Sequence, residues 1–277
     1  MAKLMKHELK ANSRIMLPVF LLTALLSVLG GLSARFLNSG HDSVLLKIVF
    51  GMFIAIFAIS IALLALLCVI YMVQRFYETM AGREAYLTLN LPLSIDEHIC
   101  SKLLTAMMWS MLTTLVTVAA IAIFLLVSAG SKPFEILSKA YFEIRAKIAM
   151  LGISDGDVAL MMLEAAILTI IQLVVSYLTI YTAIAIGQQS SEKKLGSSIA
   201  AFAGISVLTN LLGNLVTRAV VEYVGDYTQV FECQSMNIDI VKFTTPIFLS
   251  FLVYGLVLCA IFYFVSSRLF KTRLNLV

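Results

Sequence analysis

The chain has 277 residues, of which 61% are hydrophobic and only 13% are charged, whereas soluble domains are about 25% charged. A soluble domain of this composition would expose more apolar surface than water tolerates, so the composition excludes that class and favours a membrane protein. The formal net charge of +4 is spread along the edges of apolar segments. It therefore forms no concentrated basic surface of the kind that binds nucleic acid.

Six apolar stretches reach the length of about 20 residues that a helix needs to cross a bilayer. The predicted spans cover residues 15–34, 48–73, 103–129, 158–187, 198–217 and 245–267. The first stretch is longer than the apolar core of a signal peptide and is followed by no small-x-small cleavage motif, so we interpret it as a span. The sequence thus predicts an all-α, polytopic protein in which residues 1–277 form one transmembrane domain.

The distribution of basic residues predicts the orientation of these spans. With the N-terminus inside, the inner segments hold 12 of the Lys and Arg residues and the outer segments hold 8. Because cytoplasmic loops carry the excess of Lys and Arg, both termini are expected in the cytoplasm.

Residues 1–14 have the pattern of a basic amphipathic helix. Lys6 and Lys10 share one face, whereas Met5 and Leu9 lie on the opposite face. Such a helix beside a span tends to lie on the anionic cytoplasmic leaflet. We expect an interfacial helix, and both simple anchoring and contact with a cytoplasmic partner fit this pattern.

The cytoplasmic segment 74–102 contains leucines that water should not favour. Pro92 is expected to end the helix that precedes it, and Ser94 with Glu97 forms a capping box that begins the helix leading into the third span. The leucines between these signals need either lipid or another protein to cover them: Leu87, Leu89, Leu91 and Leu93.

Two outer segments complete the predicted topology. Residues 131–151 have apolar residues at helical spacing and a favourable i, i+4 pair of Glu135 and Lys139, which predicts an external amphipathic helix. Both packing on the membrane surface and a lid over an exit path fit this helix. Residues 218–243 are expected to connect the last two spans outside the membrane.

Uncharged polar residues within the spans are the candidates for a translocation path. In lipid such groups face another helix or a wet cavity, so helix–helix contact is the alternative interpretation. Glu164 is the only acidic residue within a span and is a candidate on that ground, although its helix is long enough to place it at the outer interface. The remaining candidates are Thr113, Thr117, Gln172, Ser176, Asn210 and Asn214.

Catalytic and metal-binding motifs are absent from the sequence. It contains no Walker-type glycine-lysine loop, no His-Glu-x-x-His pattern and no Gly-x-Ser-x-Gly elbow. His7, His41 and His98 lie outside the predicted spans and far apart. We therefore expect no catalytic residue, metal site or cofactor on this chain.

The most specific pattern is the stretch Gly82-Arg-Glu-Ala-Tyr-Leu-Thr-Leu-Asn-Leu-Pro-Leu-Ser94, followed by Ser101-Lys102-Leu103. It is similar to a glycine-acid-x-tyrosine-leucine…leucine-proline-x-serine stretch of the ABC-2 type permeases, the membrane subunits of bacterial ATP-binding-cassette exporters. The layout of a basic amphipathic start and six spans also resembles that family. The resemblance implies that a coupling helix lies here and docks in a groove of an ATPase, through Gly82, Arg83, Glu84, Tyr86, Leu89, Leu91, Pro92, Leu93 and Ser94.

The resemblance further implies a set of partners and a location. Two copies of the chain would pair with two copies of a separate ATPase subunit, which would bind ATP and Mg²⁺, in the bacterial plasma membrane and among its lipids. Amphipathic peptides are the cargo that this branch of the family implies. A permease for lipids, drugs or ions, an ion-coupled secondary transporter and a dimerising scaffold are the alternatives. The long outer helix at 131–151 departs from the family pattern.

Overall fold

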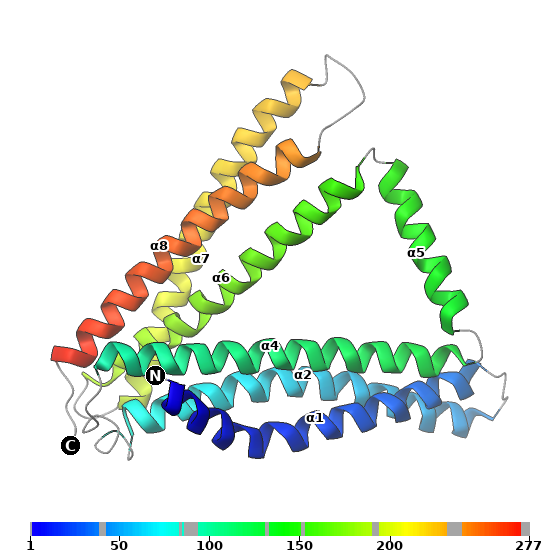
Figure 1. The fold of residues 1–277 in the computed structure, drawn as a ribbon, viewed down its shortest axis with the longest axis horizontal. Helices are drawn as coiled ribbons and strands as arrows, with labels where there is room; N and C mark the ends of the chain where they lie inside the picture. The colour runs from blue at the N-terminus through cyan, green and yellow to red at the C-terminus, as the bar shows by residue number, and fades with distance from the viewer. Residues whose placement is uncertain are drawn as a thin grey trace. The chain divides into compact units, whose positions relative to one another are not determined.

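The computed structural model of the chain describes residues 2–38, 43–82, 85, 94–130, 133–150, 153–189, 194–231 and 240–272. Over these residues the fold is all-α, as predicted, and it contains seven α-helices (Figure 1). They are α1 (Ala2–Asn38), α2 (Val44–Met80), α4 (Ile95–Ala129), α5 (Pro133–Met150), α6 (Asp155–Gly187), α7 (Lys194–Phe231) and α8 (Ile240–Thr272).

Six of the seven helices are long and apolar enough to cross a membrane. All but α5 contain an 18-residue window whose mean hydropathy lies between 1.8 and 3.1. Most of the large apolar side chains on these helices are exposed, as expected for surfaces that lipid covers. The chain is therefore a multi-pass membrane protein with six candidate spans, which confirms the number predicted from the sequence.

The helices are longer than the apolar stretches that predicted them. Helix α1 runs without a break through the predicted amphipathic segment and the first predicted span. The interfacial position of its first turns stays a prediction. Helix α7 continues to Phe231. The first part of the predicted connecting segment, 218–231, is therefore helical, and its position outside the membrane stays a prediction.

Local sequence signals set the beginnings of two helices. Ser94 N donates to Glu97 Oε2 at 3.0 Å and Glu97 N donates to Ser94 Oγ at 3.3 Å. This confirms the predicted capping box at the beginning of α4. A second capping box, which the sequence analysis missed, joins Ser154 and Asp157 at the beginning of α6.

The first of two compact units comprises Met1–Arg75 and Cys100–Glu143. Within it α1, α2 and α4 lie side by side (Figure 1). A Cβ atom at Gly31 would lie 2.8 Å from Val127 Cβ, so α1 and α4 approach more closely there than a larger residue would permit. The rings of Phe57 and Phe124 stack with centroids 4.9 Å apart, which packs α2 against α4.

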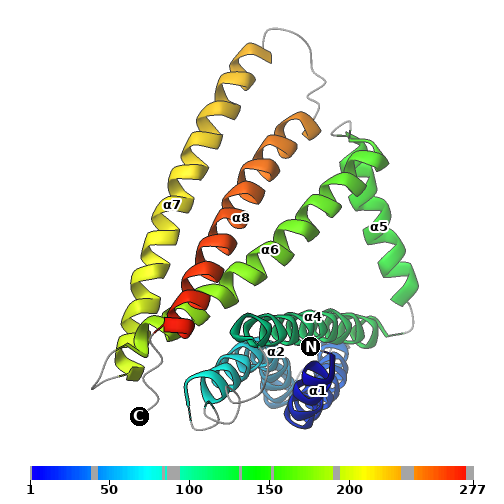
Figure 2. The ribbon, with the colours of Figure 1, turned by 60° about the vertical axis from the view of Figure 1, so that its left-hand side comes forward.

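The second unit comprises Phe76–Ile99 and Ile144–Val277. Its long helices α6, α7 and α8 lie close together at one end and diverge toward the other (Figures 1 and 2). At the closed end, a Cβ atom at Gly187 would lie 2.6 Å from Ser198 N, and Ser197 Oγ donates to Gly187 O at 2.8 Å. The absence of a side chain at Gly187 thus lets α6 and α7 meet at this end. Toward the other end the two helices diverge.

Candidate functional site

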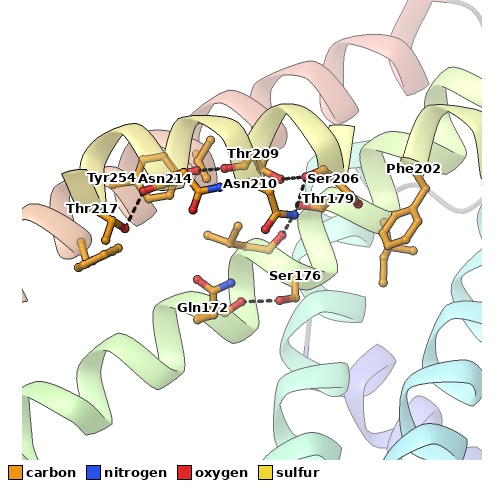
Figure 3. A pocket seen from close by; sticks show the side chains of 15 residues that line it. Gln172, Ser176, Thr179, Phe202, Ser206, Thr209, Asn210, Asn214, Thr217 and Tyr254 are labelled. Atoms are coloured by element: carbon orange, nitrogen blue, oxygen red, sulfur yellow. Dashed lines mark hydrogen bonds between the residues drawn. The ribbon is translucent and has the colours of Figure 1, made fainter. Parts of the chain in front are cut away.

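A cleft of about 430 Å³ lies between α6, α7 and α8 of the second unit (Figure 3). Its volume falls in the range of about 300–1,000 Å³ that is usual for small-molecule sites. None of the residues that line it is Asp, Glu, Lys, Arg or His. The cleft is therefore polar without being charged, and it lies between helices that are candidate membrane spans.

Helix α6 forms one wall through Gln172, Ser176 and Thr179. Spacings of four and three residues place these side chains on one face of a helix. Ser176 Oγ donates to Gln172 O at 2.8 Å and Thr179 Oγ1 donates to Val175 O at 2.8 Å. Both hydroxyl protons are thus satisfied by the backbone of α6 itself.

Helix α7 forms the opposite wall with a stripe of five polar residues. Asn210 Nδ2 donates to Ser206 O at 2.7 Å, and Thr217 Oγ1 donates to Gly213 O at 2.8 Å. Within the described residues, the Asn214 side chain makes no hydrogen bond. The five residues are Ser206, Thr209, Asn210, Asn214 and Thr217 (Figure 3).

Helix α8 contributes a tyrosine that joins two walls. Tyr254 Oη donates to Thr209 O at 2.7 Å, a hydrogen bond between α8 and α7. Phe251 and Leu258 of α8 and Phe202 of α7 add apolar surface to the same cleft. The lining therefore combines hydroxyl and amide groups with aromatic and aliphatic side chains.

A second, more apolar hollow of about 530 Å³ adjoins the cleft between α6 and α8. The two share Gln172, Ser176, Phe251 and Tyr254. Its other lining residues include Leu168, Ile171 and further apolar side chains. A polar space and an apolar space thus meet along one edge of α6.

The structure brings together four of the seven residues predicted for a translocation path. Gln172, Ser176, Asn210 and Asn214 all line the cleft. Five other polar lining residues were missed, namely Thr179, Ser206, Thr209, Thr217 and Tyr254. The helical period along α7 was a signal that could have found three of them, because Ser206, Thr209 and Thr217 lie on the face that carries Asn210.

The other three predicted path residues do not line the cleft. Thr113 and Thr117 belong to α4 in the first unit, where their hydroxyls donate to Trp109 O and Thr113 O. Glu164 precedes Gln172 by two turns of α6, and its Oε1 accepts a hydrogen bond from Thr245 Oγ1 at 3.1 Å. Glu164 therefore bridges α6 to α8 rather than contributing a charge to the lining.

The predicted coupling segment is described only in part. Gly82 and Ser94 lie within the described residues, and Ser94 has the capping role given above. The remaining predicted coupling residues lie outside the described residues: Arg83, Glu84, Tyr86, Leu89, Leu91, Pro92 and Leu93.

The two flanks of this segment contact the helices that line the cleft. Before the segment, the Phe76 ring stacks on Tyr181 of α6 with centroids 3.6 Å apart, and it meets Phe270 of α8 edge-on at 6.0 Å. After the segment, Asp96 accepts hydrogen bonds from Ser267 and Lys271 of α8. Both ends of the segment are thus attached to α6 or α8 within the second unit.

A buried ion cluster joins three helices of the first unit. Glu8 Oε1 accepts from Lys102 Nζ at 2.9 Å, and Glu8 Oε2 lies 3.4 Å from Arg75 Nε. The side chains of Glu8 and Lys102 are only 11% and 6% exposed. Since an unpaired buried charge is strongly unfavourable, this cluster fixes the N-terminal part of α1 against α2 and α4.

These observations define the class as a polytopic α-helical membrane protein with an uncharged polar cleft between three of its candidate spans. No protein-family model matches the sequence, and neither the curated proteins nor the solved structures gave a match. In the part of the chain that the structure describes, no group of three or more His, Cys, Asp or Glu residues could hold a metal ion.

Proposed function

We propose that this chain is the permease subunit of an ATP-driven exporter of the ATP-binding-cassette type. The observation that carries the proposal is the attachment of both flanks of segment 82–93 to the helices around the cleft, through Phe76 and Asp96. A force applied to this segment by a partner would be transmitted to α6 and α8, which form two sides of the cleft. That is the arrangement a permease needs when a separate protein supplies the energy.

The proposed assembly follows from what the chain lacks as well as from the resemblance of residues 82–94. The sequence has no Walker-type loop, so ATP and Mg²⁺ would bind to a separate ATPase subunit. A second copy of the permease would complete the transporter within the plasma membrane. The leucines of the coupling segment would pack into a groove of the ATPase, which would give these side chains an apolar partner.

Amphipathic peptides are the proposed cargo. A lining of uncharged polar and aromatic residues is compatible with such a molecule. Lipids, drugs and ions are the other cargoes to compare.

The test is the rate of ATP hydrolysis by the complex of permease and ATPase reconstituted in proteoliposomes, with each class of molecule added in turn. Stimulation by amphipathic peptides is expected, whereas stimulation by lipids or drugs and not by peptides would overturn the choice of cargo.

The coupling contact has its own test. Leu93→Glu places a charge in the proposed contact with the ATPase, so it should lower ATPase binding and uncouple hydrolysis without unfolding the spans. Leu274→Glu is a matched control, because it adds the same charge outside the coupling segment, near the C-terminus. Normal ATPase binding by Leu93→Glu would show that the contact lies elsewhere.

A further inference from the structure

Of the six hydroxyl groups that line the cleft between α6, α7 and α8, five are arranged to accept hydrogen bonds, and only that of Ser206 donates to no described residue. Four lining residues already donate their hydroxyl protons to backbone carbonyls within their own helices: Ser176, Thr179, Thr209 and Thr217. The Tyr254 hydroxyl proton is committed to Thr209 O on the neighbouring helix. A hydroxyl has one proton and two lone pairs, so each of these oxygens can still accept but can no longer donate without breaking an existing bond.

Two amide side chains provide the remaining directional contacts. The side chains of Gln172 on α6 and Asn214 on α7 make no hydrogen bond to another described residue. Both are exposed and line the cleft from opposite walls. Each offers a carbonyl oxygen as well as an NH₂ group, so a ligand between the walls would meet acceptors on both sides.

The absence of charge from the lining sets a second condition. None of the lining residues is ionisable at neutral pH, since Tyr254 is the only titratable group among them. An ion that entered a site of low dielectric without a counter-charge would lose its hydration with no compensation. The lining therefore discriminates against charged head groups and favours neutral ones.

The adjoining apolar hollow sets a third condition. It shares Gln172, Ser176, Phe251 and Tyr254 with the cleft and is otherwise lined mainly by apolar side chains of α6. A molecule whose polar group occupies the cleft would have its hydrocarbon part next to Leu168 and Phe251. The two spaces together fit an amphiphile rather than a wholly polar solute.

We propose that this composite site, built within a single copy of the chain, binds an uncharged amphiphile whose polar group carries O–H or N–H donors. This proposal deepens the proposed function, because it gives the chemistry of the molecule or molecular segment that the permease would hold. It rests on the proposed function only where it takes the bound amphiphile to be the cargo. Binding itself requires neither the ATPase nor ATP.

The experiment uses photo-crosslinking of the full chain in lipid nanodiscs without ATPase or ATP. The three probes have the same diazirine-bearing hydrocarbon chain and differ only in the head group: a monoacylglycerol with two hydroxyls, its dimethyl ether without donors, and a trimethylammonium head. Mass spectrometry of the digested protein locates the labelled peptides. We expect saturable labelling of α6 and α7 by the monoacylglycerol, and roughly two- to tenfold weaker labelling by the dimethyl ether, the range for the loss of one hydrogen bond. The charged probe should label these peptides least.

Variants locate the contact. Gln172→Leu and Asn214→Leu remove exposed amides at nearly constant size, and each should reduce monoacylglycerol labelling toward the level of the dimethyl ether. Thr114→Val is the matched control, because its hydroxyl donates to Ser110 O within α4 and Thr114 does not line the cleft. Equal labelling of α6 and α7 by all three probes, or unchanged labelling of both leucine variants, would overturn the proposal. Failure of the chain to bind an ATPase would instead contradict the proposed function and leave this result standing.

Discussion

The ring of Phe76, near the end of α2, lies flat against the ring of Tyr181 on α6, with centroids 3.6 Å apart and planes inclined by 6°. Both side chains are 1% exposed, and Phe270 of α8 packs edge-on against the same phenylalanine. The stack joins the beginning of the proposed coupling region to a helix that lines the cleft. It is therefore the contact through which movement of residues 82–93 would reach α6.

Removal of the Tyr181 ring should loosen this attachment. Tyr181→Ala deletes a buried aromatic side chain, a change that costs about 3–5 kcal/mol in protein cores. Tyr181→Phe keeps the ring and should lose much less stability than Tyr181→Ala. Thermal unfolding of both variants in detergent checks the difference. Equal melting temperatures for Tyr181→Ala and the wild type would show that the stack does not hold the two elements together.

The ion cluster of the first unit should be far more sensitive than a surface pair. Glu8→Gln removes the buried carboxylate that accepts from Lys102 Nζ at 2.9 Å, so the free energy of unfolding should fall by about 1.5–3 kcal/mol. Glu135→Gln is the control, because its pair with Lys139 is exposed and worth about 0.3–0.5 kcal/mol. A double variant, Glu8→Gln with Lys102→Met, should recover part of the loss. Chemical denaturation of the four proteins measures the series, and similar effects of Glu8→Gln and Glu135→Gln would contradict the importance of the cluster.

Two glycines of the second unit should respond in opposite directions to alanine. At Gly187 an added Cβ atom would lie 2.6 Å from backbone atoms of Ser198, so Gly187→Ala should force α6 and α7 apart and destabilise the protein by about 1–3 kcal/mol. At Gly204 no atom lies within 4 Å of that position, so Gly204→Ala should stabilise α7 by about 0.5–1 kcal/mol. Melting temperatures of the two variants report the signs. A stabilising Gly187→Ala would mean that α6 and α7 do not approach so closely at Gly187 and Ser198.

Glu164 distinguishes an ATP-driven permease from an ion-coupled secondary transporter. Its carboxylate accepts a hydrogen bond from Thr245, and the carbonyl of glutamine can accept the same bond. Glu164→Gln should therefore retain most of the transport activity of the wild type. A secondary transporter would need this charge on its pathway, since it is the only acidic residue within the predicted spans. Loss of transport in Glu164→Gln, at an unchanged protein level, would favour that alternative.

Local features of this molecule were predictable from the sequence. The apolar stretches predicted all six candidate spans, because a helix in lipid must be apolar over its whole length. Ser94 and Glu97 predicted the beginning of α4, because a capping box depends only on residues three positions apart. The spacing of Gln172 and Ser176 placed them on one face of α6. Each of these predictions rests on interactions within a single helix.

Contacts between helices were not predictable in the same way. The pairing of Glu8 with Lys102 joins residues 94 positions apart, and neither residue has a local pattern that marks its partner. Phe76 belongs to the predicted cytoplasmic segment 74–102 and Tyr181 to a predicted span, and no local pattern marks them as partners. Hydropathy also predicted where the fifth apolar stretch ends but not where α7 ends. Arg218 and Glu222 lower the hydropathy of the sequence without ending the helix. Thr113 and Asn210 looked equivalent in the sequence, and only tertiary packing assigned them to different units.

The most direct test of the proposed function is to purify this chain from its own cells and to ask whether an ATPase subunit purifies with it. We expect an ATPase subunit to remain bound in a one-to-one ratio through affinity and size-exclusion chromatography in detergent. Quantitative mass spectrometry of the eluted complex would measure that ratio. Purification of this chain alone, from cells in which an ATP-binding-cassette ATPase is abundant, would contradict the proposed function and would favour a secondary transporter or a scaffold.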